Sequence, residues 1–120
     1  MMASKARLFD DRIILPEILA ANHPRQTQIL GRKIKGFQET IWNEHRFQIV
    51  VDGNVAKFQQ NPLLTEFILS TQDHILVEAS PDDRIWGIGL AADNPNIENP
   101  YLWQGTNLLG FALMEVLSLL

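Results

Sequence analysis

The residues best suited to chemistry lie in one stretch, Leu76–Gly89, where acids, an indole and two glycines follow an apolar run. Residues 74–79 predict a short buried strand that ends in an acid. Residues 80–83, Ser-Pro-Asp-Asp, predict a turn, since proline fixes φ and Asp or Ser side chains bond nearby amides. Functional residues concentrate on such loops, and glycines let a ligand approach the backbone. A strand, a turn and a core tryptophan are the alternative. The candidate ligand-binding residues here are Glu78, Trp86 and Gly87.

A lysine near the start of the chain is the candidate nucleophile. Helical spacing places Lys5 on one face with Met1, Met2, Leu8 and Phe9. An amine in such an apolar stripe loses hydration, which lowers its pKa toward the range in which it attacks a carbonyl-like carbon. The alternative is a packed stem with the ammonium in water.

Six further side chains have chemistry that suits a site. Asp82 and Asp83 are candidates for the general acid and base, although adjacent turn carboxylates are more often solvated caps. Trp42 and Trp86 can stack on a planar base, or can belong to the core. Arg32 and Lys57 can hold a phosphate, or can be ordinary surface charges.

Composition bounds the function. A chain of 120 residues with 46% apolar and 20% charged residues predicts one soluble globular domain over residues 1–120. A net charge of -4 disfavours a general nucleic-acid binder, while a local basic pocket for one phosphate is allowed. Nothing predicts a membrane span or a signal peptide, and no cysteine is present, so we expect a cytoplasmic protein.

Two familiar motifs are absent or out of context. His23, His45 and His74 are scattered, without the spacing that holds a metal on one helix face, so no metal site is expected. Residues 87–92 match G-x-G-x-x-A, but a turn precedes them and Asp93-Asn94-Pro95 prevents the long helix that this fingerprint requires. The sequence therefore predicts neither a metal nor a dinucleotide cofactor.

The periodicity predicts a mainly α fold around the short strand. Between Phe37 and Phe58 the evidence conflicts, because apolar residues repeat helically while Asp52-Gly53 is a hairpin signal; we favour a long helix. Residues 93–104 are rich in Asn and Pro and predict irregular structure. The other expected helices cover residues 1–9, 16–21, 25–34, a segment capped by Asn61-Pro62, and 107–120.

Taken together, several segments resemble the NADAR family, also called YbiA-like. They are Met1–Phe9, Leu30-Gly-Arg32, Phe37–Trp42, Lys57–Asn61, Leu76–Gly89 and Gly105–Met114, whose order and spacing match over nearly the whole chain. The resemblance implies a compact, mainly helical single domain with N-glycosidase activity, and it favours the helical alternative for residues 37–58. It also implies substrates: phosphoribosylated aminopyrimidines of riboflavin synthesis, or ADP-ribosylated guanine, including a modified nucleic-acid base.

The resemblance also implies site residues. Lys5 falls on the lysine of the Met-x-x-Lys-Ala segment, expected to form a Schiff base with the sugar, and Asp83 and Trp42 complete the expected catalytic group. Cleavage of an N-glycosidic bond builds positive charge on the sugar and negative charge on the base, so an anion and a proton source are needed. The expected substrate-binding residues are Arg32, Lys57, Glu78, Trp86, Gly87, Gly105 and Asn107.

One departure concerns the start of the chain. Family members carry several tens of residues before the Met-Met pair, including a glutamate thought to be catalytic, and this sequence begins after them. We therefore expect an N-terminally incomplete NADAR-like domain. The alternatives are a catalytically impaired module that binds a nucleotide-like ligand, and a fragment that does not fold alone. The sequence does not predict the oligomeric state.

Overall fold

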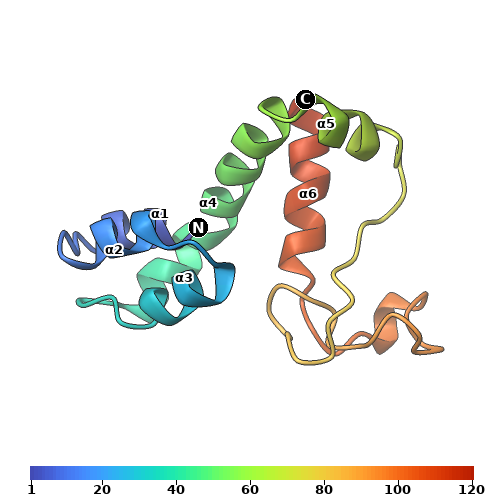
Figure 1. Cartoon of the computed structure of the whole chain (residues 1–120). Coiled ribbons are helices and arrows are strands. Elements are labelled where there is room, and N and C mark those ends of the chain that lie inside the picture. The colour runs from blue at the N-terminus through green and yellow to red at the C-terminus, as the bar shows by residue number, and fades with distance from the viewer. The chain divides into compact units, whose positions relative to one another are not determined.

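Six α-helices and one short 3-10 helix account for all the regular structure of the chain (Figure 1). The computed structural model describes residues 1–120, the whole sequence given. The elements are α1 (Met2–Leu8), α2 (Ile14–Ala20), α3 (Pro24–Gly31), α4 (Glu39–Gln59), α5 (Pro62–Leu69), η1 (Pro100–Leu102) and α6 (Leu108–Leu119). The expectation of a mainly α fold is therefore confirmed.

The expected strand at residues 74–79 is wrong. These residues form no strand, because a strand needs a ladder of backbone bonds to a neighbouring segment. Here the polar groups bond otherwise: Ser80 and Ile88 both donate their N–H groups to the Glu78 carbonyl, and the Asn107 side chain bonds the backbone of residues 76 and 78. The segment is an apolar, irregular connection.

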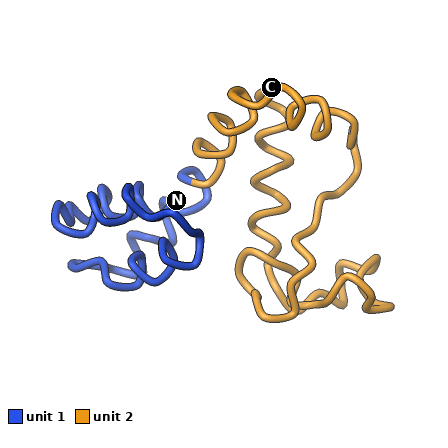
Figure 2. Tube along the Cα trace, viewed as in Figure 1, with its two compact units in different colours: residues 1–49 blue, residues 50–120 orange.

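Contacts divide the chain into two compact units, residues 1–49 and residues 50–120 (Figure 2). The boundary falls inside α4, which therefore belongs in part to each unit. We describe each unit by itself. That residues 1–120 form a single domain stays a prediction.

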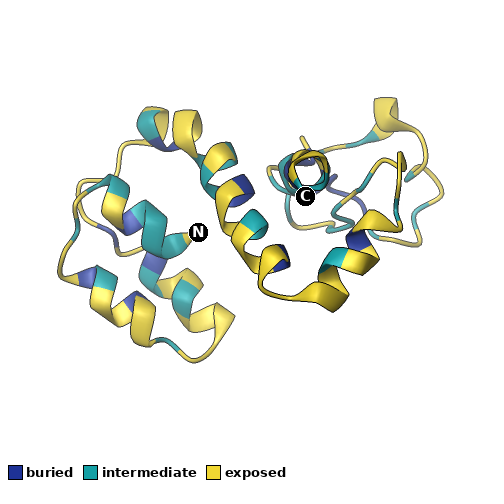
Figure 3. Ribbon diagram, turned by 90° about the horizontal axis from the view of Figure 1, so that it is seen from above, coloured by how far each residue is buried: buried dark blue, intermediate teal, exposed yellow.

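In unit 1, helices α1, α2 and α3 pack against one another. Their shared core is a small apolar cluster, and the outward helix faces are exposed (Figure 3). The buried members are Ala6, Ile14, Ile18 and Ile34, with Met2, Ala3, Phe9, Leu15 and Leu30 packed against them. Burial of such side chains from water is the main force that holds the three helices together.

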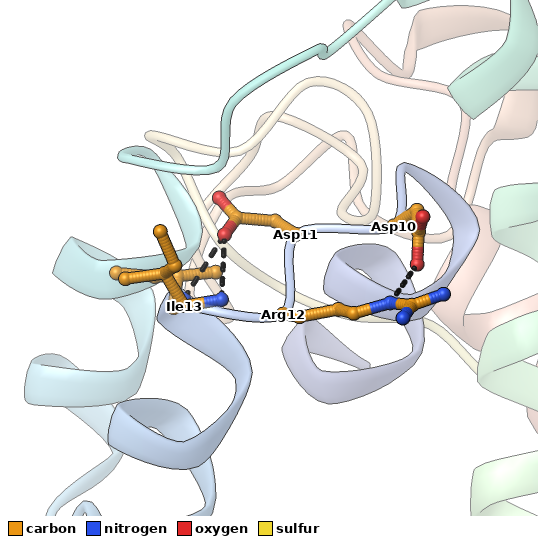
Figure 4. Close-up of polar contacts among 5 residues, drawn as sticks. Asp10, Asp11, Arg12 and Ile13 are labelled. Atoms are coloured by element: carbon orange, nitrogen blue, oxygen red, sulfur yellow. Dashed lines mark hydrogen bonds and ion pairs between the residues drawn. The ribbon is translucent and has the colours of Figure 1, made fainter.

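A single carboxylate organises the turns around α2. One Asp11 oxygen accepts the N–H groups of Ile13 and Ile14 at 3.2 and 3.0 Å, which caps the start of α2 (Figure 4). The other oxygen accepts the N–H of Lys35 at 2.8 Å and so fixes the turn after α3. The hydrogen bonds from these backbone N–H groups lower the pKa of the Asp11 carboxyl, and the bond from Lys35 has the largest effect. The neighbouring Asp10–Arg12 ion pair, 2.9 Å long, is exposed.

The third expected helix was too long. It was expected to reach Ile34, but α3 ends at Gly31 and the next residues form a turn. The Lys35–Asp11 bond holds that turn against the start of α2, so a tertiary contact ends the helix earlier than its local propensity indicates. In contrast, α4 runs straight through Gly53, where the surroundings are open and helical burial outweighs the hairpin signal.

In unit 2, α6 carries the buried residues Gly110, Ala112 and Val116. Ile88, from the loop before it, is also completely buried, and Leu90 nearly so. Val51 and Phe58 from α4 and Ile68 from α5 are buried too, so the apolar residues of this unit come from its helices and from the irregular segment that holds the candidate loop. None of the chain's helices combines the length and the hydrophobicity needed to cross a membrane.

Candidate functional site

In unit 1 the Lys5 amine lies next to a backbone carbonyl and two aromatic rings. The Lys5 Nζ donates a hydrogen bond to the Gly31 carbonyl at 3.1 Å. The same atom lies 4.7 Å from the ring centroid of Phe37 and 5.3 Å from that of Trp42, both within cation–π range. Lys5 and Trp42 therefore lie close together, and their membership of one catalytic site stays a prediction.

The amine is chemically perturbed. Partial burial lowers the pKa of Lys5, because an ammonium loses hydration there, and the nearby positive charge of Arg32 lowers it further. A larger fraction of Lys5 is therefore in the neutral, nucleophilic form at a given pH than for an ordinary lysine. This arrangement suits attack on an electrophilic carbon.

The position of Lys5 depends on two residues that sequence reasoning did not assign to the site. Gly31 is buried, and a Cβ on it would overlap the sulfur of Met2, so a larger residue there would displace the Met2 side chain. Phe37 precedes α4, half exposed, and its ring meets that of Phe9 edge-on with centroids 5.3 Å apart. The available signal was a glycine inside a predicted helix, which usually has a packing reason.

In unit 2, hydrogen bonds join the candidate residues between Glu78 and Asn107 into one loop region. Asp83 accepts the N–H groups of Ile85 and Trp86 through one carboxylate oxygen, at 3.0 and 2.8 Å, and this closes the turn that precedes Gly87. Its second oxygen makes no bond within the chain. Glu78 and Trp86 are partly exposed, and the glycine between Trp86 and Ile88 is buried.

The loop of residues 84–87 is joined to the start of α6 by a run of backbone bonds. The N–H groups of residues 106, 107, 108 and 109 donate to the carbonyls of residues 84, 87, 85 and 86, at 3.0 to 3.1 Å. Gly105 makes this approach feasible, since a Cβ there would overlap the Gly87 carbonyl and the backbone of Arg84. The N–H groups of residues 106–109 are therefore occupied and are not free to bind an anion.

Asn107 fixes the loop from within. It is fully buried and adopts a left-handed conformation, with φ 53° and ψ 39°. Its side-chain oxygen accepts the N–H of Glu78 at 3.0 Å, and its side-chain nitrogen donates to the Leu76 carbonyl at 2.9 Å. The visible role of Asn107 is to position the loop, and contact with a substrate stays a prediction.

The remaining candidates are surface cations. Arg32 caps the end of α3 and is exposed, and Lys57 lies exposed in the last turn of α4. No three His, Asp or Glu side chains gather into a cluster that could ligate a metal. Because Lys5 and Trp42 belong to unit 1 and Asp83 to unit 2, the convergence of these three residues stays a prediction.

Known proteins resemble this chain over nearly its whole length. N-glycosidase R617 of Acanthamoeba polyphaga mimivirus is 44% identical over 116 residues, which are 97% of this chain and 68% of the viral protein. N-glycosidase Npun_R5314 of Nostoc punctiforme is 33% identical and covers 88% of this chain. The riboflavin biosynthesis protein PYRR of Zea mays is 34% identical and covers 89%.

The chain is shorter than each of these relatives. It spans 61% of the Nostoc protein and 16% of the maize protein. The model of the NADAR domain family matches residues 1–120. With that match and the similarity to the mimivirus protein, the chain belongs to the NADAR family.

Proposed function

We propose that the chain is an N-glycosidase that hydrolyses the bond between a ribose C1 and a base nitrogen in a small ribosylated molecule. The observation that carries the proposal is the Lys5 amine, bonded to the Gly31 carbonyl, next to two aromatic rings and with a lowered pKa. Membership of the NADAR family and relatives named N-glycosidases support it.

The chemistry follows from the electron demand at C1. The Lys5 lone pair attacks C1 and forms a C–N bond, the bond from C1 to the base breaks, and its electron pair passes to the base nitrogen. Asp83 is proposed to supply the proton that the departing base takes up, or to stabilise the positive charge that builds on the sugar. The ribose ring then opens to a Schiff base, and water adds at C1 to release the free sugar and regenerate the amine.

The remaining residues are proposed to hold the substrate. Trp42 or Trp86 stacks on the base, because an indole face suits a planar heterocycle. Arg32 and Lys57 are the proposed phosphate contacts, since both are exposed cations. The proposed lining is completed by Glu78, Gly87, Gly105 and Asn107.

We propose phosphoribosylated intermediates of riboflavin synthesis as the first substrates to test, supported by the name of the maize relative. ADP-ribosylated guanine, free or in a nucleic acid, is the second class. The purified chain is incubated with each compound, and released base is measured by chromatography. Borohydride is added in parallel, because it reduces a Schiff base to a stable adduct that mass spectrometry assigns to a residue.

The matched variants are Lys5→Ala and, as a control, Lys33→Ala, which removes an exposed lysine that makes no contact with either ring. We expect Lys5→Ala to lose both base release and the adduct, and Lys33→Ala to keep both. Full activity of Lys5→Ala would contradict the proposed nucleophile. Saturable nucleotide binding without product from the unmodified chain would instead support a non-catalytic binding module.

A further inference from the structure

The contacts of the Lys5 amine favour its charged form. The Gly31 carbonyl accepts a hydrogen bond from Nζ at 3.1 Å, and the ring centroids of Phe37 and Trp42 lie 4.7 and 5.3 Å from the same atom. A carbonyl oxygen and the face of an aromatic ring both carry partial negative charge, so each attracts an ammonium more strongly than a neutral amine. Lys5 forms no ion pair with an acid, so these contacts are its direct electrostatic partners.

The charged groups around the amine act in the opposite direction or are occupied elsewhere. Burial lowers the pKa of Lys5, and the positive charge of Arg32 at the end of α3 lowers it further. In the turn after α1, Asp10 pairs with Arg12, and Asp11 accepts backbone N–H groups. The acids of the other neighbouring elements form no ion pair with Lys5; they are Glu17 of α2 and Glu39 and Glu44 of α4.

The Phe37 ring is supported by the same part of unit 1 that carries Lys5. Phe9 follows α1 directly and packs against the buried cluster of this unit. The Phe37 ring meets the Phe9 ring edge-on, with centroids 5.3 Å apart and an angle of 62° between the planes. Edge-to-face contacts of this kind are favourable. Phe37 is 44% exposed, yet its ring is therefore held in a fixed position beside the amine.

We propose that Phe37 is a positioning residue for Lys5: its ring, supported by Phe9, holds the ammonium against the Gly31 carbonyl and so sets the pH above which the amine becomes neutral and reactive. The reactivity of Lys5 is then a balance, in which the ring and the carbonyl favour the charged form and burial and Arg32 favour the neutral one. In the part that treats Lys5 as the nucleophile, the inference rests on the proposed function.

A change in the electrons of the ring, without a change in its shape, tests the proposal. A ring-fluorinated phenylalanine, incorporated at position 37 by codon suppression, packs like Phe37 but has a much less negative face. The intact protein is acylated over a pH series, and mass spectrometry gives the midpoint pH at which Lys5 becomes reactive. We expect this midpoint to fall, and Lys5 to react about two- to fivefold faster below it, as loss of one cation–π contact at an exposed site predicts.

A purely structural role of the ring predicts no change, because the fluorinated ring fills the same space. An unchanged or raised midpoint would therefore overturn the proposal. Phe37→Tyr keeps an aromatic face and should keep the original midpoint; a fall as large as that of the fluorinated protein would also contradict the proposal. The control is the same fluorinated residue at Phe111 of α6, which is 42% exposed and should leave the midpoint unchanged.

The pH profile of base release connects this test to the reaction. Because only the neutral amine attacks, the acidic side of the profile should move to lower pH in the fluorinated protein, together with the acylation midpoint. The two proposals fail in different ways. If the midpoint moves but Lys5→Ala still releases base, Phe37 positions the amine and Lys5 is not the nucleophile. If base release requires Lys5 but the midpoint does not move, the nucleophile stands and the role of Phe37 does not.

Discussion

Replacement of Asn107 is the most direct test of how the candidate loop is held. Asn107 is the one buried polar residue of the chain, and its amide bonds both Leu76 and Glu78, 31 and 29 residues earlier. In Asn107→Ala both backbone partners lose their bonds. Alanine must also adopt the left-handed conformation that asparagine tolerates better than most residues.

The magnitude follows from these two effects. An unsatisfied buried backbone group costs about 1–3 kcal/mol. Residues 76 and 78 are only partly buried, so we take about 1–2 kcal/mol for each. The left-handed conformation costs alanine about 1–2 kcal/mol more. We therefore expect Asn107→Ala to lower the free energy of unfolding by about 3–6 kcal/mol.

Asn107→Gly separates the two effects, because glycine adopts a positive φ without steric cost but makes neither side-chain bond. It should be more stable than Asn107→Ala by about 1–2 kcal/mol. Urea denaturation followed by tryptophan fluorescence gives both values by linear extrapolation. Asn96→Ala is the control, since Asn96 is an exposed loop residue whose side chain makes no bond within the chain. Losses below about 1 kcal/mol for both Asn107 variants would contradict the stabilising role of the two side-chain hydrogen bonds. Equal losses would contradict the proposed cost of the left-handed conformation for alanine.

Two further predictions concern unit 1. Arg32→Ala should raise the pKa of Lys5 toward its ordinary value, so acylation of Lys5, followed by mass spectrometry, should require higher pH; an unchanged profile would exclude this electrostatic effect. The lowered pKa of Asp11 means that its charge stabilises the fold above the ordinary value of 3.8, and this contribution is lost as pH falls through the folded-state pKa. The destabilisation caused by Asp11→Asn, measured by urea titration, should accordingly be largest near neutral pH and shrink in acid; a constant difference would contradict it.

The helices were largely predictable from sequence because their signals are local. The spacing of apolar residues predicted α4, and Asn61-Pro62 predicted the start of α5. Burial of the apolar face of α4 favoured a continuous helix over a hairpin at Gly53. The apolar helix face that contains Lys5 is also visible in the local sequence. That Lys5 lies near Trp42 was expected only from the family resemblance and from the stacking that an indole can provide.

The parts that were not predictable depend on partners distant in the chain. Residues 74–79 have strand-like composition, but whether a strand forms depends on a neighbour for its ladder, and here Asn107 takes that place. The end of α3 depends in the same way on Asp11, 24 residues before the amide that it binds. The residues around Gly31 in the sequence do not indicate that the sulfur of Met2 packs against this glycine.

The bonds between residues 84–87 and the first turn of α6 have a consequence for motion. Four amides at that turn donate to four successive loop carbonyls, so the loop cannot swing aside while the turn stays intact. Opening of the loop and fraying of the start of α6 are then a single event. The amide protons of residues 106–109 should therefore exchange with solvent at one common rate.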